Sequence, residues 1–207
     1  MNGGNFARGF AARENSLAGE ACEGISGFAA KRFALAPTPA SYAGYIFRCC
    51  RFPSIRKGYW DYGGEADVVD FTVDKDIMLH GLCLCGSETS DYSVDLTIIG
   101  CKPGYLPHTL VSKTGRFSSK LLQHANYYGL EILFDSTITC KKNIKYEIIA
   151  IISGPVSWFG SDGVSTVVCS GVTFTFTANA DYGNGTSTRS GQFPEILFSL
   201  SPNPAYI

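Results

Sequence analysis

The sequence has little charge and no long apolar run. Charged residues make up 17% of its 207 residues, and the formal net charge is -1. A nearly neutral chain attracts neither nucleic acid nor an anionic membrane surface, so we expect neither as a partner. No stretch approaches the roughly 18 to 20 apolar residues that cross a bilayer, which argues against membrane insertion. Proteins or small ligands remain as the expected partners.

The sequence also lacks a secretion signal at its start, since Met1 to Arg8 is interrupted by glycine and arginine and contains no apolar core. We therefore expect a soluble intracellular protein in the cytoplasm. An even number of cysteines can form disulfides in a secreted domain, but without a signal we expect free thiols that pack as small hydrophobic side chains. The eight cysteines are Cys22, Cys49, Cys50, Cys83, Cys85, Cys101, Cys140 and Cys169.

The chain divides into a flanking segment, one domain and a short tail. Residues 1–46 are rich in glycine, alanine and serine and predict a linker or flanking segment, part of which can pack on the domain. Their only helix-like run is Phe28 to Ala36, which Pro37 and Pro39 end. Residues 47–200 are long enough to bury a core, and residues 201–207 form the tail.

Alternating apolar residues in the domain predict β-strands, because alternate side chains of a strand share one face. Glycine and proline turns such as Tyr62-Gly63-Gly64 and Lys102-Pro103-Gly104 separate the runs. Many short strands with such turns indicate an all-β, antiparallel two-sheet sandwich, jelly-roll-like in form. The expected strands lie at 69–73, 77–85, 92–98, 130–134, 144–152, 172–176 and 195–200.

The sequence carries no constellation that indicates catalysis or a metal. Cys83 and Cys85 would share one strand face, yet zinc needs two more ligands and no second close pair occurs, so core packing is favoured. Cys101 or Cys140 could meet a histidine in space, but the chain lacks the local motifs of nucleophilic enzymes. His80 lies in a strand pattern, which favours a structural histidine. We expect no catalytic residue, no metal and no cofactor.

Asn184-Gly185-Thr186 matches the acceptor pattern for N-linked glycans. That pattern matters only in a secreted protein. Asn-Gly also supplies the positive φ angles of a type I′ hairpin, so we favour a tight turn over a glycan.

Aromatic residues gather in three glycine-rich stretches and predict a binding surface. Large aromatic side chains on loops are frequent hot spots, because they bury much area at little entropic cost. The alternative for each is that it plugs one end of the sandwich. The residues expected to bind a partner are Arg56, Lys57, Trp60, Trp158, Phe159, Tyr182 and Asn184, with the two cations at the rim.

Several phrases together resemble the PHR domain, over about residues 47 to 200. They are Arg51-Phe52 with Gly58 to Gly64, Asp67 to Asp74, Gly81 to Gly86, and Gly183 to Ser187 with Gly191 to Ile196. The departures from the family pattern are Cys85, where a tyrosine is expected, and the unmatched leading segment. The wording Lys57-Gly58-Tyr59-Trp60-Asp61 is more similar to the Pam/Highwire ubiquitin ligases than to the BTB adaptors.

The resemblance implies an antiparallel β-sandwich that binds intracellular proteins, either substrates or regulators, for a large E3 ubiquitin ligase. In such ligases a separate RING region transfers ubiquitin, so this domain would not itself be an enzyme. Two alternatives remain: the PHR domain of a BTB-type ligase adaptor, and a jelly-roll module that binds glycans. A signal peptide, oxidised cysteines and an occupied Asn184 would favour the glycan alternative.

Overall fold

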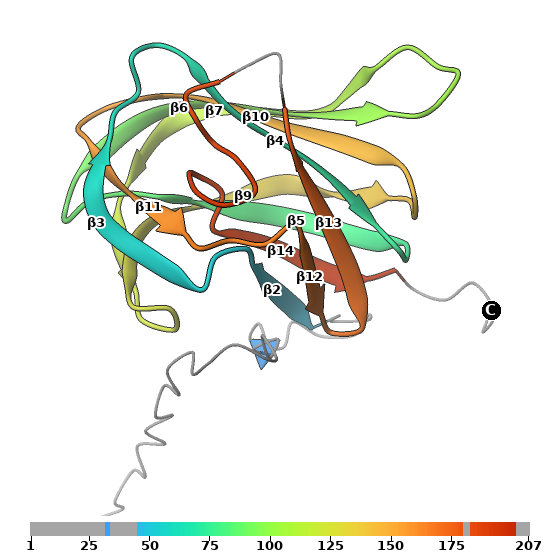
Figure 1. The fold of residues 1–207 in the computed structure, drawn as a ribbon. Helices are drawn as coiled ribbons and strands as arrows, with labels where there is room; N and C mark the ends of the chain where they lie inside the picture. Colours follow the sequence, from blue (N-terminus) through green and yellow to red (C-terminus); the bar gives the residue numbers. More distant parts are fainter. Residues whose placement is uncertain (1–31, 34–44, 180–182, 202–207) are drawn as a thin grey trace, which may run out of the picture.

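A computed structural model describes residues 32–33, 45–179 and 183–201. This part of the chain contains strands and no helix, so no membrane-spanning helix is found in it. Two six-stranded antiparallel sheets stack on each other, and a two-stranded ribbon lies at one side of them (Figure 1). The all-β sandwich expected from the sequence is confirmed.

The first sheet contains the strands nearest to both described ends of the domain. In spatial order they are β1 (Arg32–Phe33), β2 (Ile46–Cys50), β14 (Glu195–Leu200), β5 (Ile77–Cys85), β9 (Tyr127–Cys140) and β8 (Lys120–Leu122). The second sheet consists of β12 (Thr166–Cys169), β13 (Val172–Ala178), β4 (Ala66–Val73), β10 (Lys145–Ser153), β6 (Asp91–Cys101) and β7 (His108–Ser118).

The ribbon pairs β3 (Ser54–Trp60) with β11 (Ser157–Ser161), about a hundred residues later in the sequence. Ser161 lies opposite Ser54, and Phe159 lies opposite Arg56. Beyond Phe159 the register shifts, so that Ser157 lies opposite Trp60. Extra residues in one strand of a pair bend it and increase its twist. The ribbon is therefore a separate, curved element beside the two sheets.

The core lies between the two sheets and uses the alternating residues that the sequence indicated. Phe71 of β4, Ile148 of β10 and Leu96 of β6 face Leu82 of β5 and Ile196 of β14. Aromatic rings fill the end near β13, where Phe174 meets Phe198 at 5.0 Å between ring centroids. Each of the seven expected strands is present.

A smaller apolar cluster covers part of the outer face of the first sheet. Cys83 and Leu197 of that sheet pack under Leu122 and Tyr127, with Ile55 and Trp158 of the ribbon beside them. Cys83 is thus fully buried and packed, as the sequence indicated. This cluster joins the ribbon to the first sheet.

The flanking segment differs from its sequence interpretation at one point. Arg32–Phe33 lies within the helix-like run Phe28 to Ala36 but forms strand β1, antiparallel to β2. The helix interpretation is wrong there, because edge pairing with β2 satisfies the same backbone groups. The rest of that run lies outside the described residues. The division at residues 46 and 200 stays a prediction.

Candidate binding surface

Three sequence phrases that are far apart in the chain meet at Asp67, at the start of β4. Its carboxylate accepts hydrogen bonds from Trp60 Nε1 (3.2 Å), Asn184 Nδ2 (3.2 Å) and Thr186 Oγ1 (2.6 Å). The Asn184 side chain also donates to the backbone oxygen of Asp61, at 2.7 Å. Asp67 therefore fixes the end of β3 and the loop before β14 in one arrangement.

Asp67 is a buried carboxylate whose three side-chain donors are all neutral. Its exposed fraction is 0%. Burial raises the pKa of Asp67 to about 6, and the hydrogen bonds from Thr186, Asn184 and Trp60 offset only part of that effect. The carboxylate that positions Trp60 and Asn184 thus ionises at a higher pH than an exposed aspartate.

The loop that carries Asn184 is held at several further points. Gln192 is buried; its Oε1 accepts from the backbone N–H of Cys85 at 2.9 Å, and its Nε2 donates to Ser157 Oγ at 3.0 Å. Gly191 has a φ of 125°, and a Cβ there would lie 2.3 Å from Thr186 Oγ1, so only glycine fits. The Asn184 loop is therefore tied to β4, β5 and β11.

Arg51 supports the same loop from beneath. Its guanidinium is buried, donates to the backbone oxygens of Ser187 (2.6 Å) and Gln192 (3.3 Å), and lies over the ring of Phe176. Burial lowers the pKa of Arg51 to about 9. A buried cation held by backbone oxygens makes this loop a fixed part of the domain.

Asn184 does not form the hairpin that its sequence suggested. A type I′ turn needs positive φ at both central residues, but only Gly185 has one, at 88°, while Asn184 has none. The hairpin expectation is wrong because the side chain of Asn184 is used for the contacts with Asp61 and Asp67. A glycan would replace one of the two hydrogens on the same amide nitrogen, so at least one of the two contacts would be lost.

The ribbon divides the expected binding residues between its two faces. On one face Trp60 packs against Phe159, with ring centroids 5.6 Å apart, and Arg56 donates to Ser161 and pairs with Asp162 at 3.1 Å. Trp60 also lies beside Gly185 in the Asn184 loop. Arg56, Trp60, Phe159 and Asn184 are thus brought together.

The other face of the ribbon carries Lys57 and Trp158. The Lys57 ammonium lies 4.9 Å from the centre of the Trp158 ring and pairs with Glu88 at 3.1 Å. Trp158 meets Tyr128 of β9 edge to face, at 5.5 Å between centroids. Both tryptophans are half-buried, so each combines packing with an exposed part. Tyr182 lies outside the described residues.

Sequence reasoning did not include Tyr59 among the binding residues, although its ring is 89% exposed on β3. Its position between Lys57 and Trp60 could have indicated a binding residue, but the sequence alone does not show how exposed the side chain is. We call Arg56, Lys57, Tyr59, Trp60, Trp158, Phe159 and Asn184 together the ribbon surface, although they lie on both faces of the ribbon.

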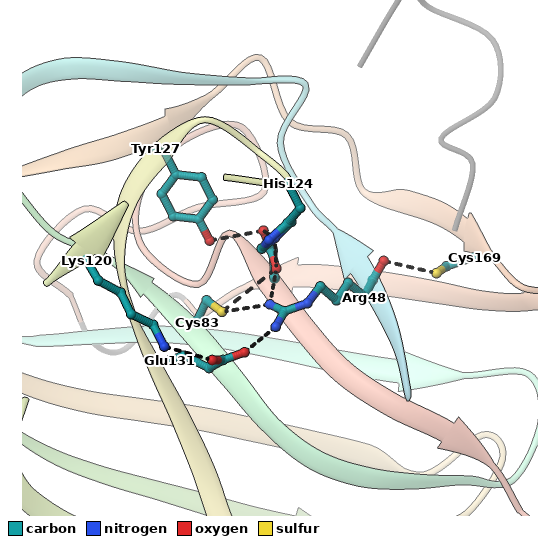
Figure 2. A network of polar contacts seen from close by, with 8 residues as sticks. Arg48, Cys83, Lys120, His124, Tyr127, Glu131 and Cys169 are labelled. Atoms are coloured by element: carbon teal, nitrogen blue, oxygen red, sulfur yellow. Dashed lines mark hydrogen bonds and ion pairs between the residues drawn. The ribbon is translucent and has the colours of Figure 1, made fainter. Parts of the chain in front are cut away.

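A second polar cluster lies around Glu195 on the outer face of the first sheet. Its members Arg48, His124 and Tyr127 are labelled in Figure 2. Glu195, 1% exposed, accepts from Arg48 (2.8 Å), His124 (2.9 Å) and Tyr127 (3.1 Å). Arg48 also pairs with Glu131, which in turn pairs with Lys120 at 3.2 Å. Burial alone would raise the pKa of Glu195, but His124 and Arg48 hold it below its usual value. The cluster fastens the turn before β9 to the sheet.

The Glu195 cluster does not have the properties of a nucleophilic site. Cys83 is adjacent to Arg48 and Glu195 but is fully buried, and burial raises the pKa of its thiol. His80 Nε2 lies 2.8 Å from Ser199 Oγ and joins β5 to β14, and its structural role stays a prediction. Burial raises the pKa of Cys140 to about 12. Among the described residues no three His, Cys, Asp or Glu side chains are placed to hold a metal.

Comparisons with known proteins identify the family. The PHR domain model matches residues 50–199, so the chain belongs to the PHR domain family. It is 32% identical over 156 residues to BTB/POZ domain-containing protein 6 of Xenopus tropicalis, covering 73% of this chain and 28% of that protein. Protein 6-B of Danio rerio is 33% identical, with 73% of this chain and 30% of that protein covered. BTB/POZ domain-containing protein 3 of Homo sapiens is 30% identical, with 73% and 28% covered. The match spans less than a third of each of these relatives.

Proposed function

We propose that this PHR domain is a non-catalytic module that binds intracellular proteins and recruits them, as substrates or regulators, to a ubiquitin ligase. The ribbon surface carries the proposal. It presents two tryptophans, a phenylalanine and an exposed tyrosine on a rigid support, and such residues dominate protein interfaces. The rigid support lowers the entropic cost of binding.

The relatives favour a BTB-type adaptor over the Pam/Highwire ligase that the sequence wording suggested. The relatives named above are BTB/POZ domain-containing proteins. We therefore propose that the domain serves the adaptor class, in which recruitment and ubiquitin transfer reside in different proteins. The proposed site of action is the cytoplasm.

Two exposed tyrosines give a matched test. Tyr59 lies on the ribbon surface, whereas Tyr105, 66% exposed, lies at the tip of the β6–β7 hairpin. Proteins captured from cytosol by the full chain should be lost with Tyr59→Ala and kept with Tyr105→Ala. A hot spot costs at least about 2 kcal/mol, roughly thirtyfold in affinity. Equal capture by both variants contradicts the proposed surface.

Variants of Trp158 and Phe159 need a stability measurement alongside the binding measurement, because both side chains are half-buried. Trp158→Ala and Phe159→Ala are expected to lose captured proteins, and Trp158→Ala also to lower the melting temperature, since Trp158 packs on Tyr128. Normal capture by both folded variants would remove β11 from the surface. Capture from an extracellular fraction alone would favour the glycan-binding alternative.

A further inference from the structure

Most edge strands of the described sheets are short or covered. Strands β1, β8 and β12 have two, three and four residues, and short edges offer little to a further strand. Strand β7 is long, but it lies against β9, where Lys113 pairs with Asp135 at 2.6 Å. Strand β3 has seven residues and pairs only with β11 within the described chain.

The hydrogen-bond pattern shows which backbone groups of β3 are unpaired. Gly160 of β11 exchanges two hydrogen bonds with Gly191, at 2.9 and 3.0 Å, so its N–H and C=O point away from β3. The opposing residue, Ile55, therefore forms a non-hydrogen-bonded pair with Gly160, and its own N–H and C=O point away from β11. Lys57 lies at the register shift and has no Cα partner on β11. The far side of β11 is occupied by Gly191 and Gly86, whereas no strand of the described residues pairs with the outer edge of β3.

The charged side chains of β3 do not guard this edge. Charged residues on an edge strand usually oppose further pairing. Here the Arg56 guanidinium reaches Ser161 and Asp162, and the Lys57 ammonium crosses Trp158 toward Glu88, so both side chains lean over β11. Tyr59, almost fully exposed, is the large side chain beside this edge.

We propose that the outer edge of β3 accepts an extended, acidic segment of a partner protein as a third strand of the ribbon. This rests on the proposed function of the ribbon surface. Backbone hydrogen bonds to Ile55 and Lys57 would give affinity, and an apolar side chain of the segment would pack on Tyr59.

Charge selects an acidic occupant. Both charged residues of β3, Arg56 and Lys57, are cations. Their present partners Asp162 and Glu88 form exposed ion pairs, which contribute little and can be exchanged. A second copy of this chain is disfavoured, because antiparallel pairing of two β3 strands would set the cations of one copy against those of the other.

The test uses a synthetic peptide that alternates glutamate with valine and is long enough to span β3. Amide exchange of the full chain is followed by NMR during titration. We expect slower exchange at Ile55 and Lys57, while Ser54 and Arg56, which already face β11, change little. A peptide that alternates lysine with valine should leave all four amides unchanged.

Lys57→Pro and Lys57→Ala form the matched pair of variants. Proline removes the backbone N–H at this position, so peptide affinity should fall at least about tenfold, whereas alanine removes only the charge and should cost about two- to fivefold. Equal weakening by both variants, no binding of the acidic peptide, or dimerisation of the chain through β3 would each overturn the proposal.

Failure of strand addition is distinguishable from failure of the ribbon surface. If cytosolic proteins are lost with Tyr59→Ala but kept with Lys57→Pro, the ribbon binds partners without adding a strand. If they are kept with both variants, the proposed function itself is wrong.

Discussion

Two of the buried carboxylates, Glu195 and Asp67, lie in contrasting surroundings. Glu195 is held by the cation Arg48 together with His124 and Tyr127, and its pKa lies below the usual value. Asp67 is held by the neutral donors Trp60, Asn184 and Thr186, and its pKa is raised to about 6. A charged partner compensates burial in the first case only.

The two carboxylates therefore differ in whether their charge, and with it their hydrogen bonding, depends on pH. Glu195 remains ionised at neutral pH and ties β2, β14 and the turn before β9 together. Asp67 changes its charge around its pKa of about 6, and it positions Trp60 and Asn184 of the ribbon surface. The proposed binding surface is therefore held by the carboxylate whose charged form is disfavoured by burial.

Removing the cation beside Glu195 should lower the free energy of unfolding more than any other change considered below. Arg48→Met leaves a buried carboxylate without its charged partner, so the free energy of unfolding at neutral pH should fall by about 3 to 5 kcal/mol. Urea denaturation measures it. The control is Arg116→Met, which breaks the exposed pair with Asp91 and should cost less than about 1 kcal/mol. Similar losses in both variants would remove the contrast between buried and exposed pairs.

Asp67 should make the free energy of unfolding fall as pH rises, whereas a carboxylate with a lowered pKa, such as Glu195, makes it rise. A raised pKa in the folded state means that the native state binds the proton more tightly than the unfolded state does. The contribution of Asp67 to the free energy of unfolding is therefore lost as pH rises from about 4 to about 6. From a reference of 3.8 to about 6, the loss between pH 4.5 and 7.5 amounts to about 2 kcal/mol. The side chain in Asp67→Asn cannot ionise, so this variant should not show that loss. Urea denaturation gives the free energy of unfolding of both proteins at the two pH values, and subtracting one protein from the other removes the effect of all other carboxylates. A difference between the two proteins that is the same at both pH values contradicts the raised pKa.

The sequence pattern predicted the strands that line the core and little of the ribbon. Strands such as β6 and β13 alternate because one face is buried against the opposite sheet. Strand β3 reads Ser-Ile-Arg-Lys-Gly-Tyr-Trp and does not alternate, because neither of its faces is fully buried. Its pairing with β11 joins segments about a hundred residues apart, which no local pattern records.

The sequence indicated several residues of the candidate site but not the contacts between them. Trp60 and Asn184 stood out as residues near glycine turns, yet nothing in the sequence indicated that Asp67 joins them. Trp158 and Phe159 are adjacent in sequence and were expected on one surface, whereas neighbouring residues of a strand point to opposite faces. Glu195 was part of a family phrase, but its partners Arg48 and His124 come from unrelated segments.

The indole N–H of Trp60 provides a smaller test of the Asp67 arrangement. Trp60→Phe keeps an aromatic ring beside Phe159 but removes one donor from the buried carboxylate, so stability at neutral pH should fall by about 1 to 2 kcal/mol more than in Trp158→Phe. Trp158 is the matched control, because its indole N–H has no hydrogen-bond partner among the described residues. Thermal denaturation of both variants decides. An equal loss would mean that ring area alone matters at Trp60.

The cations of the ribbon should contribute least to the fold. Arg56 and Lys57 form exposed ion pairs with Asp162 and Glu88, and such pairs contribute about 0 to 1 kcal/mol. Arg56→Ala and Lys57→Ala should therefore change the free energy of unfolding by less than about 1 kcal/mol, and the change should shrink further at high salt, because exposed charges are screened. Urea denaturation at low and high salt measures both. This sharpens the comparison with Arg48, since a cation that the fold does not need remains free to steer an acidic partner. A loss as large as that in Arg48→Met would instead make the ribbon cations part of the structural framework, and their proposed place in the binding surface would no longer follow.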